Sequence, residues 1–200
     1  MSLACPVNML PHVRQVFAGE YDVSISPLSP VILDIGANVG AFTVWASRRW
    51  PGSLIHSYEP ILENFKLLVR NLAYVNSRSK AYPVNCAVLN RDVEAIEMKL
   101  GLNNTGESGL YDLGEQSEKR EIVRVVQASS LPQADVIKID TEGCEVEILE
   151  GLDLSKAKAI MLEVHRNEDR AAVLMRLMDF EVACHQQIMR NRWLIKLIRQ

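Results

Sequence analysis

The chain has 200 residues, which is enough for one domain with a full hydrophobic core. Its apolar fraction of 48% and its charged fraction of 24% are those of an ordinary globular protein. The net charge of −3 gives no electrostatic reason to expect nucleic acid or an anionic membrane as the main partner, and no stretch approaches the ~20 apolar residues of a membrane span.

The four cysteines lie far apart and form no C-x-x-C pair, which argues against a zinc site or a disulfide framework. They are Cys5, Cys86, Cys144 and Cys184. Thiols in this arrangement are typical of a reducing compartment. The first residues hold two prolines and no apolar segment of signal-peptide length. We therefore expect a cytoplasmic protein.

Apolar runs alternate with helical patterns along the chain, which predicts a mostly parallel sheet covered on both faces. The expected strands are residues 31–35, 54–58, 81–85, 93–100, 121–128, 135–140 and 158–164, of which 93–100 and 121–128 could pair antiparallel. Helices are expected after Gly40, after Pro60, from Glu145 to a stop at Gly151, and after a cap at Asn167. The chain ends in two runs separated by a turn at residues 189–191, which suggests a terminal hairpin.

The turn after the first strand has the composition of a ligand-binding loop. Asp34, Gly36 and Gly40 give the spacing Asp-x-Gly-x-x-x-Gly, whereas nicotinamide and flavin enzymes use G-x-G-x-x-G. The glycines let the backbone approach a ligand at the strand's carboxyl end. Asn38 can offer its amide to a ligand carboxylate or simply tolerate a left-handed turn, and Asp34 is expected to orient the loop.

Glu59 follows the second strand directly and precedes Pro60. A carboxylate in this position can accept hydrogen bonds from both hydroxyls of a ribose. The alternative is an acid in the first turn of a helix, where the helix dipole favours it. The position favours ribose binding.

Several more ionisable residues fall near the expected carboxyl ends of buried strands. They are Lys138, Asp140, Glu142, Glu163 and His165. Residues two apart on a strand share a side, about 6.5 Å from each other. Because buried charges must be paired, we expect a connected network here. It could carry chemistry or only order the sheet edge, and for Lys138 we favour the structural role.

These stretches together resemble the FkbM-type family of S-adenosylmethionine-dependent methyltransferases. The matching segments are VILDIGANVGAFT (31–43), YEP (58–60), NCAVLN (85–90), DVIKIDTEGCEVEILEGL (135–152) and LEVH (162–165). The resemblance implies an α/β fold: a Rossmann-like, doubly wound, mostly parallel seven-stranded sheet with a C-terminal antiparallel hairpin. It also implies methyl transfer, mostly to hydroxyl oxygens of sugars, polyketides or other small metabolites. The cofactor contacts that it implies are Asp34, Gly36, Ala37, Asn38, Gly40, Glu59, Pro60, Cys86, Ala87 and Asp140.

Transfer to a hydroxyl needs a base within hydrogen-bond reach. His165 is the candidate by intrinsic pKa and Asp140 by position, while Glu142 and Glu163 could orient either one. We therefore expect His165, Asp140 and Glu142 to form the catalytic group, without a metal. Asp140, Glu142 and Glu163 could instead bind a hard divalent cation.

Residues 1–30 are expected to form an N-terminal lid and residues 31–200 the methyltransferase domain, acting on a small-molecule acceptor. The alternatives are a cofactor-binding module without turnover, an NAD(P)-dependent oxidoreductase and a nucleic-acid methyltransferase. The basic C-terminus supports the last, but its alternation with apolar residues is better explained by one strand with a solvated face. The sequence does not indicate an oligomeric state.

Overall fold

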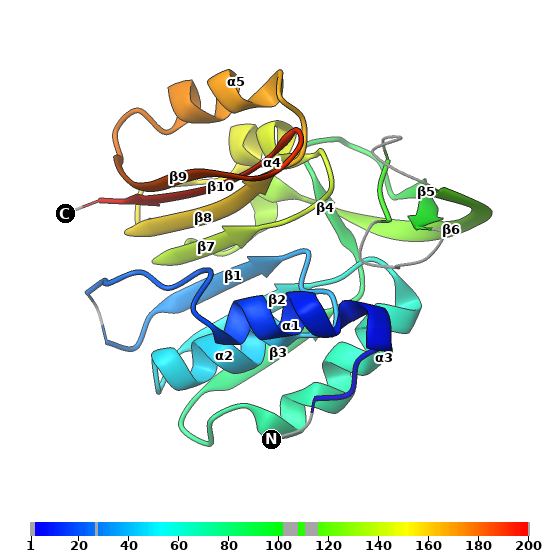
Figure 1. The fold of residues 1–200 in the computed structure, drawn as a ribbon, viewed down its shortest axis with the longest axis horizontal. Coiled ribbons are helices and arrows are strands. Elements are labelled where there is room, and N and C mark those ends of the chain that lie inside the picture. The colour runs from blue at the N-terminus through cyan, green and yellow to red at the C-terminus, as the bar shows by residue number, and fades with distance from the viewer. Residues whose placement is uncertain (1–2, 27, 102–107, 111–115, 200) are drawn as a thin grey trace.

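The computed structural model describes residues 3–26, 28–101, 108–110 and 116–199. Its centre is a seven-stranded sheet of order β3-β2-β1-β7-β8-β10-β9 (Figure 1). The strands are β1 (Val31–Ile35), β2 (Leu54–Tyr58), β3 (Lys80–Val84), β7 (Val136–Ile139), β8 (Ala159–Val164), β9 (Glu181–Met189) and β10 (Arg192–Ile198). Of these strands, only β10 is antiparallel to its neighbours, β8 and β9. The predicted fold class and the terminal hairpin are confirmed.

Helices cover both faces of this sheet (Figure 1). One face carries α1 (Leu10–Phe17), α2 (Ala41–Arg49) and α3 (Leu62–Asn71), and the other carries α4 (Glu145–Gly151) and α5 (Asp169–Arg176). The chain moves outward in one direction from β1 and in the other from β7. These two strands are neighbours, so a crevice forms at their carboxyl ends, where doubly wound sheets bind ligands.

A second sheet of three strands lies beyond the carboxyl ends of the central strands (Figure 1). It consists of β4 (Ala87–Leu89), β6 (Gln116–Gln127) and β5 (Ala95–Gly101), in that order. The antiparallel pairing of β5 with β6 confirms the sequence prediction. The sequence did not predict β4 or the separation of these strands from the main sheet. Most of the segment between β5 and β6 lies outside the described residues.

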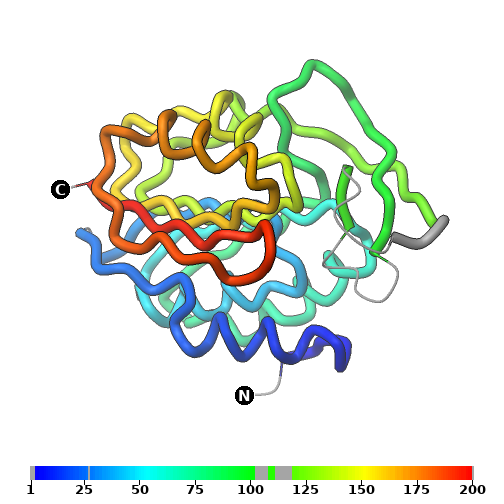
Figure 2. Tube along the Cα trace, turned by 45° about the horizontal axis from the view of Figure 1, so that its top comes forward, coloured from blue at the N-terminus to red at the C-terminus, as the bar shows by residue number. Residues whose placement is uncertain are grey.

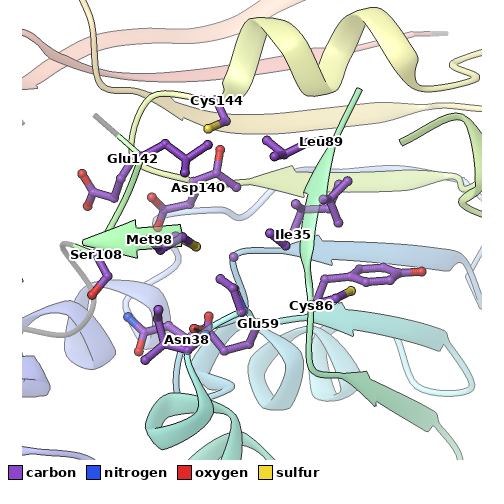
Figure 3. A pocket seen from close by; sticks show the side chains of 18 of the residues that line it. Ile35, Asn38, Glu59, Cys86, Leu89, Met98, Ser108, Asp140, Glu142 and Cys144 are labelled. Carbon is purple, nitrogen blue, oxygen red and sulfur yellow. Dashed lines mark hydrogen bonds between the residues drawn. The ribbon is translucent and has the colours of Figure 1, made fainter. Parts of the chain in front are cut away.

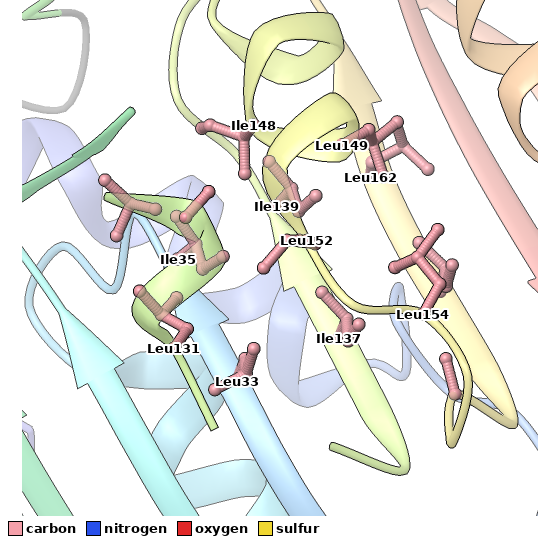
Figure 4. Packing of buried hydrophobic residues seen from close by; sticks show 14 of the residues in the cluster. Leu33, Ile35, Leu131, Ile137, Ile139, Ile148, Leu149, Leu152, Leu154 and Leu162 are labelled. Carbon is pink, nitrogen blue, oxygen red and sulfur yellow. The ribbon is translucent and has the colours of Figure 1, made fainter. Parts of the chain in front are cut away.

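Apolar side chains fill the layer between the central strands and α4 (Figure 4). The strands contribute Leu33, Ile35, Ile137, Ile139 and Leu162, and the helix contributes Ile148 and Leu149. Each of these side chains is at most 1% exposed. Strands buried on both faces need such near-continuous apolar runs, which is why the sequence marks them clearly.

Two local predictions need correction. Asn167 does not cap α5, since the residue before this helix is Glu168, which makes no side-chain cap. The side-chain Oδ1 of Asn167 instead accepts a hydrogen bond from the Trp193 indole N–H at 2.9 Å. Helix α3 begins at Leu62, two residues after Pro60.

The four cysteines are unpaired, as expected. Within the described residues, the helices all lack the length and apolar character needed to cross a membrane.

Candidate active site

The turn between β1 and α2 has a backbone that requires its glycines. Gly36 and Gly40 have φ angles of 76° and 82°, and Asn38 has a φ of 50°. A Cβ at Gly36 would overlap the backbone carbonyl of Asp140, and one at Gly40 would lie 2.6 Å from Leu68 Cδ1. The turn is therefore pressed against the end of β7 on one side and against α3 on the other.

Glu59 ties this turn to the start of α3. Its carboxylate accepts hydrogen bonds from the Asn38 N–H at 2.8 Å, the Ile61 N–H at 3.0 Å and the Asn64 side-chain amide at 3.4 Å. The side chain is 4% exposed. Burial raises the pKa of Glu59 to about 7, although these hydrogen bonds act to lower it.

A cavity lies between this turn and the three-stranded sheet, and we call it the roofed cavity (Figure 3). Its wall is largely apolar and includes Ile35, Tyr58, Ile61, Leu89 and Met98. Of the residues predicted to contact a cofactor, seven line it: Gly36, Asn38, Glu59, Pro60, Cys86, Ala87 and Asp140. Asn38 and Glu59 lie on one side of it and Asp140 and Glu142 on the other (Figure 3).

The other three predicted contacts, Asp34, Ala37 and Gly40, are not among the residues that line this cavity. Asp34 is fully buried, accepts a hydrogen bond from the Thr43 hydroxyl at 2.6 Å and lies 3.4 Å from the Lys138 ammonium. Lys138 in turn donates to the carbonyl oxygen of Gly36. Asp34 therefore stabilises the turn indirectly, by holding the Lys138 ammonium against the Gly36 carbonyl oxygen. This geometry agrees with the structural role expected for Lys138.

A second, more acidic cavity adjoins the first, and we call it the acidic cavity. Its wall includes His12 and Glu20 from the N-terminal segment and Met189 and Arg192 from the hairpin. Both of these segments lie toward the viewer in Figure 2. Asn38, Asp140 and Glu142 line both cavities, so these three residues mark the place where the two meet.

The sheet edge bordering the acidic cavity brings together the predicted ionisable residues around the ring of His165. The Nε2 atom of His165 lies 3.4 Å from Glu142 Oε2, 3.6 Å from Asp140 Oδ1 and 3.8 Å from Glu163 Oε2. The Nδ1 atom lies 2.9 Å from Glu145 Oε1, a buried carboxylate of the first turn of α4. The expected network therefore forms, and all of its members come from the ends of β7 and β8 or the start of α4.

The surroundings of His165 change the pKa on which its choice as a base rested. Burial alone would lower the pKa of His165, but the hydrogen bond and charge of Glu145, with the charges of Glu142 and Asp140, raise it to about 10. The raised pKa favours the protonated ring, which has no free lone pair with which to accept a proton. The sequence could not reveal this, because Glu145 appeared only as an acid in the first turn of a helix.

The carboxylates around this ring differ in their readiness to ionise. Burial opposes ionisation of Asp140, but Lys138 and His165 together lower its pKa. Burial raises the pKa of Glu142 to about 7 and that of Glu163 to about 8. Glu142 also faces the Arg192 guanidinium at 3.3 Å.

Sequence reasoning missed three partners of this group. Tyr21 donates its hydroxyl to Glu163 Oε1 at 2.9 Å from a position 142 residues earlier in the chain. Arg192 reaches Glu142 from the hairpin, and Glu145 holds His165. No local pattern in the sequence indicates the contacts that Arg192 and Glu145 make.

The sequence profile of the family described as "Methyltransferase FkbM domain" matches residues 34–189 of this chain. The chain is 24% identical over 225 residues to AMB antimetabolite synthetase AmbE of Pseudomonas aeruginosa, covering 86% of this chain and 11% of that protein. It is 26% identical over 193 residues to 31-O-demethyl-FK506 methyltransferase FkbM of Streptomyces tacrolimicus, covering 76% of this chain and 73% of that protein. The chain thus spans only about a tenth of the Pseudomonas relative.

The fold is also similar to solved structures. A precorrin-6y C5,15-methyltransferase from Geobacter metallireducens GS-15 superposes with a TM-score of 0.55 at 16% sequence identity. The match covers 100% of this chain and 95% of that one. At this identity the likeness shows the class I methyltransferase fold alone.

Proposed function

Because the chain belongs to the FkbM methyltransferase family, whose cofactor is S-adenosylmethionine, we propose that it transfers the cofactor's methyl group to a hydroxyl oxygen of a small molecule. The observation that carries this proposal is the pair of adjoining cavities, one largely apolar and one acidic, which meet at Asn38, Asp140 and Glu142. A two-substrate transfer needs such a meeting point, since the two reacting atoms must come within about 3–3.5 Å of each other.

The roofed cavity fits the cofactor. The buried carboxylate of Glu59 would accept the ribose hydroxyls, while Cys86, Leu89 and Met98 offer an apolar surface for the adenine. The side-chain oxygen of Asn38 is buried without a hydrogen-bond partner among the described residues, and the cofactor's methionine end would supply a donor. When bound, the cofactor supplies an electrophilic methyl group on a positively charged sulfur.

We propose Glu142 as the general base for the acceptor hydroxyl. It borders both cavities, and its pKa of about 7 lies near neutral pH, where a base works best. Asp140 stays ionised because its pKa is lowered, and its negative charge favours a cationic sulfur nearby. His165, held by Glu145, would position these two carboxylates and not take the proton itself.

The name of the Streptomyces relative specifies an O-methyl group on a small molecule, and this supports a hydroxyl acceptor by analogy. We further propose that residues 1–30 act as the lid of the acceptor site. Met9, Val13 and Val16 pack into the core, while His12 and Glu20 line the acidic cavity. This arrangement supports one domain with an N-terminal cover and a small acceptor.

The cofactor assignment is tested by thermal unfolding with S-adenosylhomocysteine against NADH. A ligand at one hundred times its Kd adds ~2.7 kcal/mol, or about 5–11 °C in Tm for a domain of this size. A shift with NADH and none with S-adenosylhomocysteine would contradict the proposal. Methyl transfer is tested by incubating the protein with radiolabelled cofactor and hydroxylated sugars or polyketides, and locating the label on oxygen by mass spectrometry. Label on nitrogen or carbon would refute the hydroxyl assignment.

A further inference from the structure

The ring of His165 has an unusual pair of environments on its two nitrogens. On one side, Nδ1 lies 2.9 Å from Glu145 Oε1, and both side chains are fully buried. On the other side, Nε2 is buried and has no hydrogen-bond partner among the described residues, although three carboxylates surround it. Their oxygens are 3.4 to 3.8 Å away, beyond the ordinary 2.7–3.2 Å range of an N–H···O bond.

This spacing suits a group held between the ring and the carboxylates better than a direct bond between them. Ligand atoms in a tetrahedral site with bonds of 2.0–2.2 Å are separated by roughly 3.3–3.6 Å. The ligand atoms of Asp140, Glu163 and His165 all lie within 4.8 Å of one another. Small side-chain rotations would therefore bring them onto one ion.

The surroundings have the features that support metal ligands. A ligating histidine almost always donates its other N–H to a carboxylate or a carbonyl, as His165 does with Glu145. Tyr21 donates to Glu163 Oε1 and leaves Oε2 facing the ring. Two of the ligands lie on β8 or directly after it and the third directly follows β7, so paired strands hold them in place.

The carboxyl groups gathered here also suit a metal ion, whose binding would displace the protons on Glu163 and His165. Four carboxylates gather here, on Asp140, Glu142, Glu145 and Glu163. Besides the His165 ring, the cationic side chains within 4 Å of them among the described residues are the Lys138 ammonium, 3.8 Å from Asp140 Oδ2, and the Arg192 guanidinium, 3.3 Å from Glu142 Oε2. Because Arg192 pairs with Glu142 Oε2, Glu142 is a poorer ligand than the other two and stays available as the base.

We propose that His165 Nε2, Asp140 Oδ1 and Glu163 Oε2 bind a divalent transition-metal ion, with Glu145 orienting the ring. The mixed nitrogen and oxygen donors fit Zn²⁺, Co²⁺ or Mn²⁺ better than Mg²⁺ or Ca²⁺, which prefer oxygen alone. The ion would replace the proton on Nε2 and would face the acidic cavity, which Asp140 and Glu163 line. The proposal reverses the expectation of a site without metal, and it does not depend on the proposed methyl transfer.

The test is a titration of the chelator-treated full chain with Co²⁺, followed by visible absorption and by calorimetry without cofactor or acceptor. We expect one ion per chain and the absorption bands of a low-symmetry Co²⁺ site. His165→Ala should remove the bands, and Glu163→Gln should raise the Kd more than tenfold. Glu145→Gln, which alters the partner of the ring and of the Gly143 N–H but none of the three ligands, should raise it roughly 10- to 100-fold.

The matched control is His185→Ala, which removes an exposed histidine of β9 and should leave both the bands and the stoichiometry unchanged. A second control addresses His12 and Glu20, which form a neighbouring group with Glu163. If His12→Ala abolishes Co²⁺ binding and His165→Ala retains it, the ion belongs to that neighbouring group and the proposal is wrong.

Wild-type protein that binds no Co²⁺ and no Zn²⁺ stoichiometrically also overturns the proposal, whatever happens to the variants. If His165→Ala does not fold, as judged by its thermal unfolding, Glu163→Gln and Glu145→Gln decide. A Kd within threefold of wild type in both would overturn the assignment. If the protein binds S-adenosylhomocysteine but no metal ion, the metal site is refuted and the proposed function is unaffected. If it binds the metal ion but not S-adenosylhomocysteine, the proposed function is refuted and the metal site is unaffected.

Discussion

Replacing Glu59 by glutamine changes one oxygen to an amide and should weaken cofactor binding strongly, although the two side chains have the same shape. Both carboxylate oxygens accept backbone N–H groups, one from Asn38 and one from Ile61. A glutamine has a single oxygen, so in either orientation its NH₂ faces one of these N–H donors. The same NH₂ cannot accept a ribose hydroxyl.

Two separate costs are expected. A buried N–H without an acceptor costs ~1–3 kcal/mol and lowers the stability of the fold with or without cofactor, whereas each hydrogen bond of a ribose hydroxyl to a charged group contributes ~1.5–3 kcal/mol, and its loss lowers affinity. A loss of about 3 kcal/mol corresponds to more than a hundredfold increase in Kd. Calorimetry with S-adenosylhomocysteine measures this directly, and thermal unfolding checks that the variant is folded.

Glu63→Gln is the matched control, because Glu63 is an exposed acid in the first turn of α3 and should not affect binding. In the wild type, affinity should increase as pH rises through about 7, the pKa of Glu59, because the ionised carboxylate accepts both hydroxyls. The glutamine variant should lack this dependence. A folded Glu59→Gln protein with a Kd within threefold of wild type would refute the ribose assignment.

Three further predictions concern the turn and the acidic group. The rate of methyl transfer should increase as pH rises through about 7, the pKa of Glu142. Glu142→Gln should lower kcat by roughly 10²–10⁴ and leave the affinity for S-adenosylhomocysteine unchanged, whereas a retained kcat would exclude Glu142 as the base. Gly36→Ala should lower the free energy of unfolding by about 3 kcal/mol or more, because the added Cβ would overlap the Asp140 carbonyl. Urea unfolding measures this, and a loss under about 1 kcal/mol would contradict the close approach of Gly36 to Asp140. The free energy of unfolding of the metal-free protein should fall from pH 5 to 8, because Glu163 (pKa about 8) stays protonated in the folded state over a range where the unfolded chain has ionised. His165 (pKa about 10) contributes in the same direction above pH 6.5, and Glu59 and Glu142 (pKa about 7 each) do so up to about pH 7. Glu163→Gln should therefore make the fall less steep, and an unchanged slope would speak against the raised pKa.

The strands and the cofactor turn were predictable because their signals are local. Buried parallel strands appear as apolar runs, and β2 has the predicted bounds, Leu54–Tyr58. Gly36 and Gly40 were identified by spacing, and both have the left-handed backbone that favours glycine. Glu59 was identified by its place after a strand, and it borders the roofed cavity.

The Asn167 cap and the pKa of His165 could not be predicted, for a different reason. The proposed cap at Asn167 did not account for the Trp193 indole, which comes from the hairpin 26 residues later. The basicity of His165 was estimated from the free side chain, but its pKa depends on neighbours that include Glu145, twenty residues earlier. Neither partner is visible in a window of sequence around the residue concerned.

The sequence by itself determined the alternation of strands and helices, the ligand-binding turn and the acid placed beside it, because each depends on residues adjacent in the chain. The tertiary structure alone decided how the ionisable groups behave. It brought Tyr21, Glu145 and Arg192 to the ends of β7 and β8 and buried the group. Charge state depends on burial and on the sum of nearby charges, which are properties of three-dimensional distance and not of sequence separation.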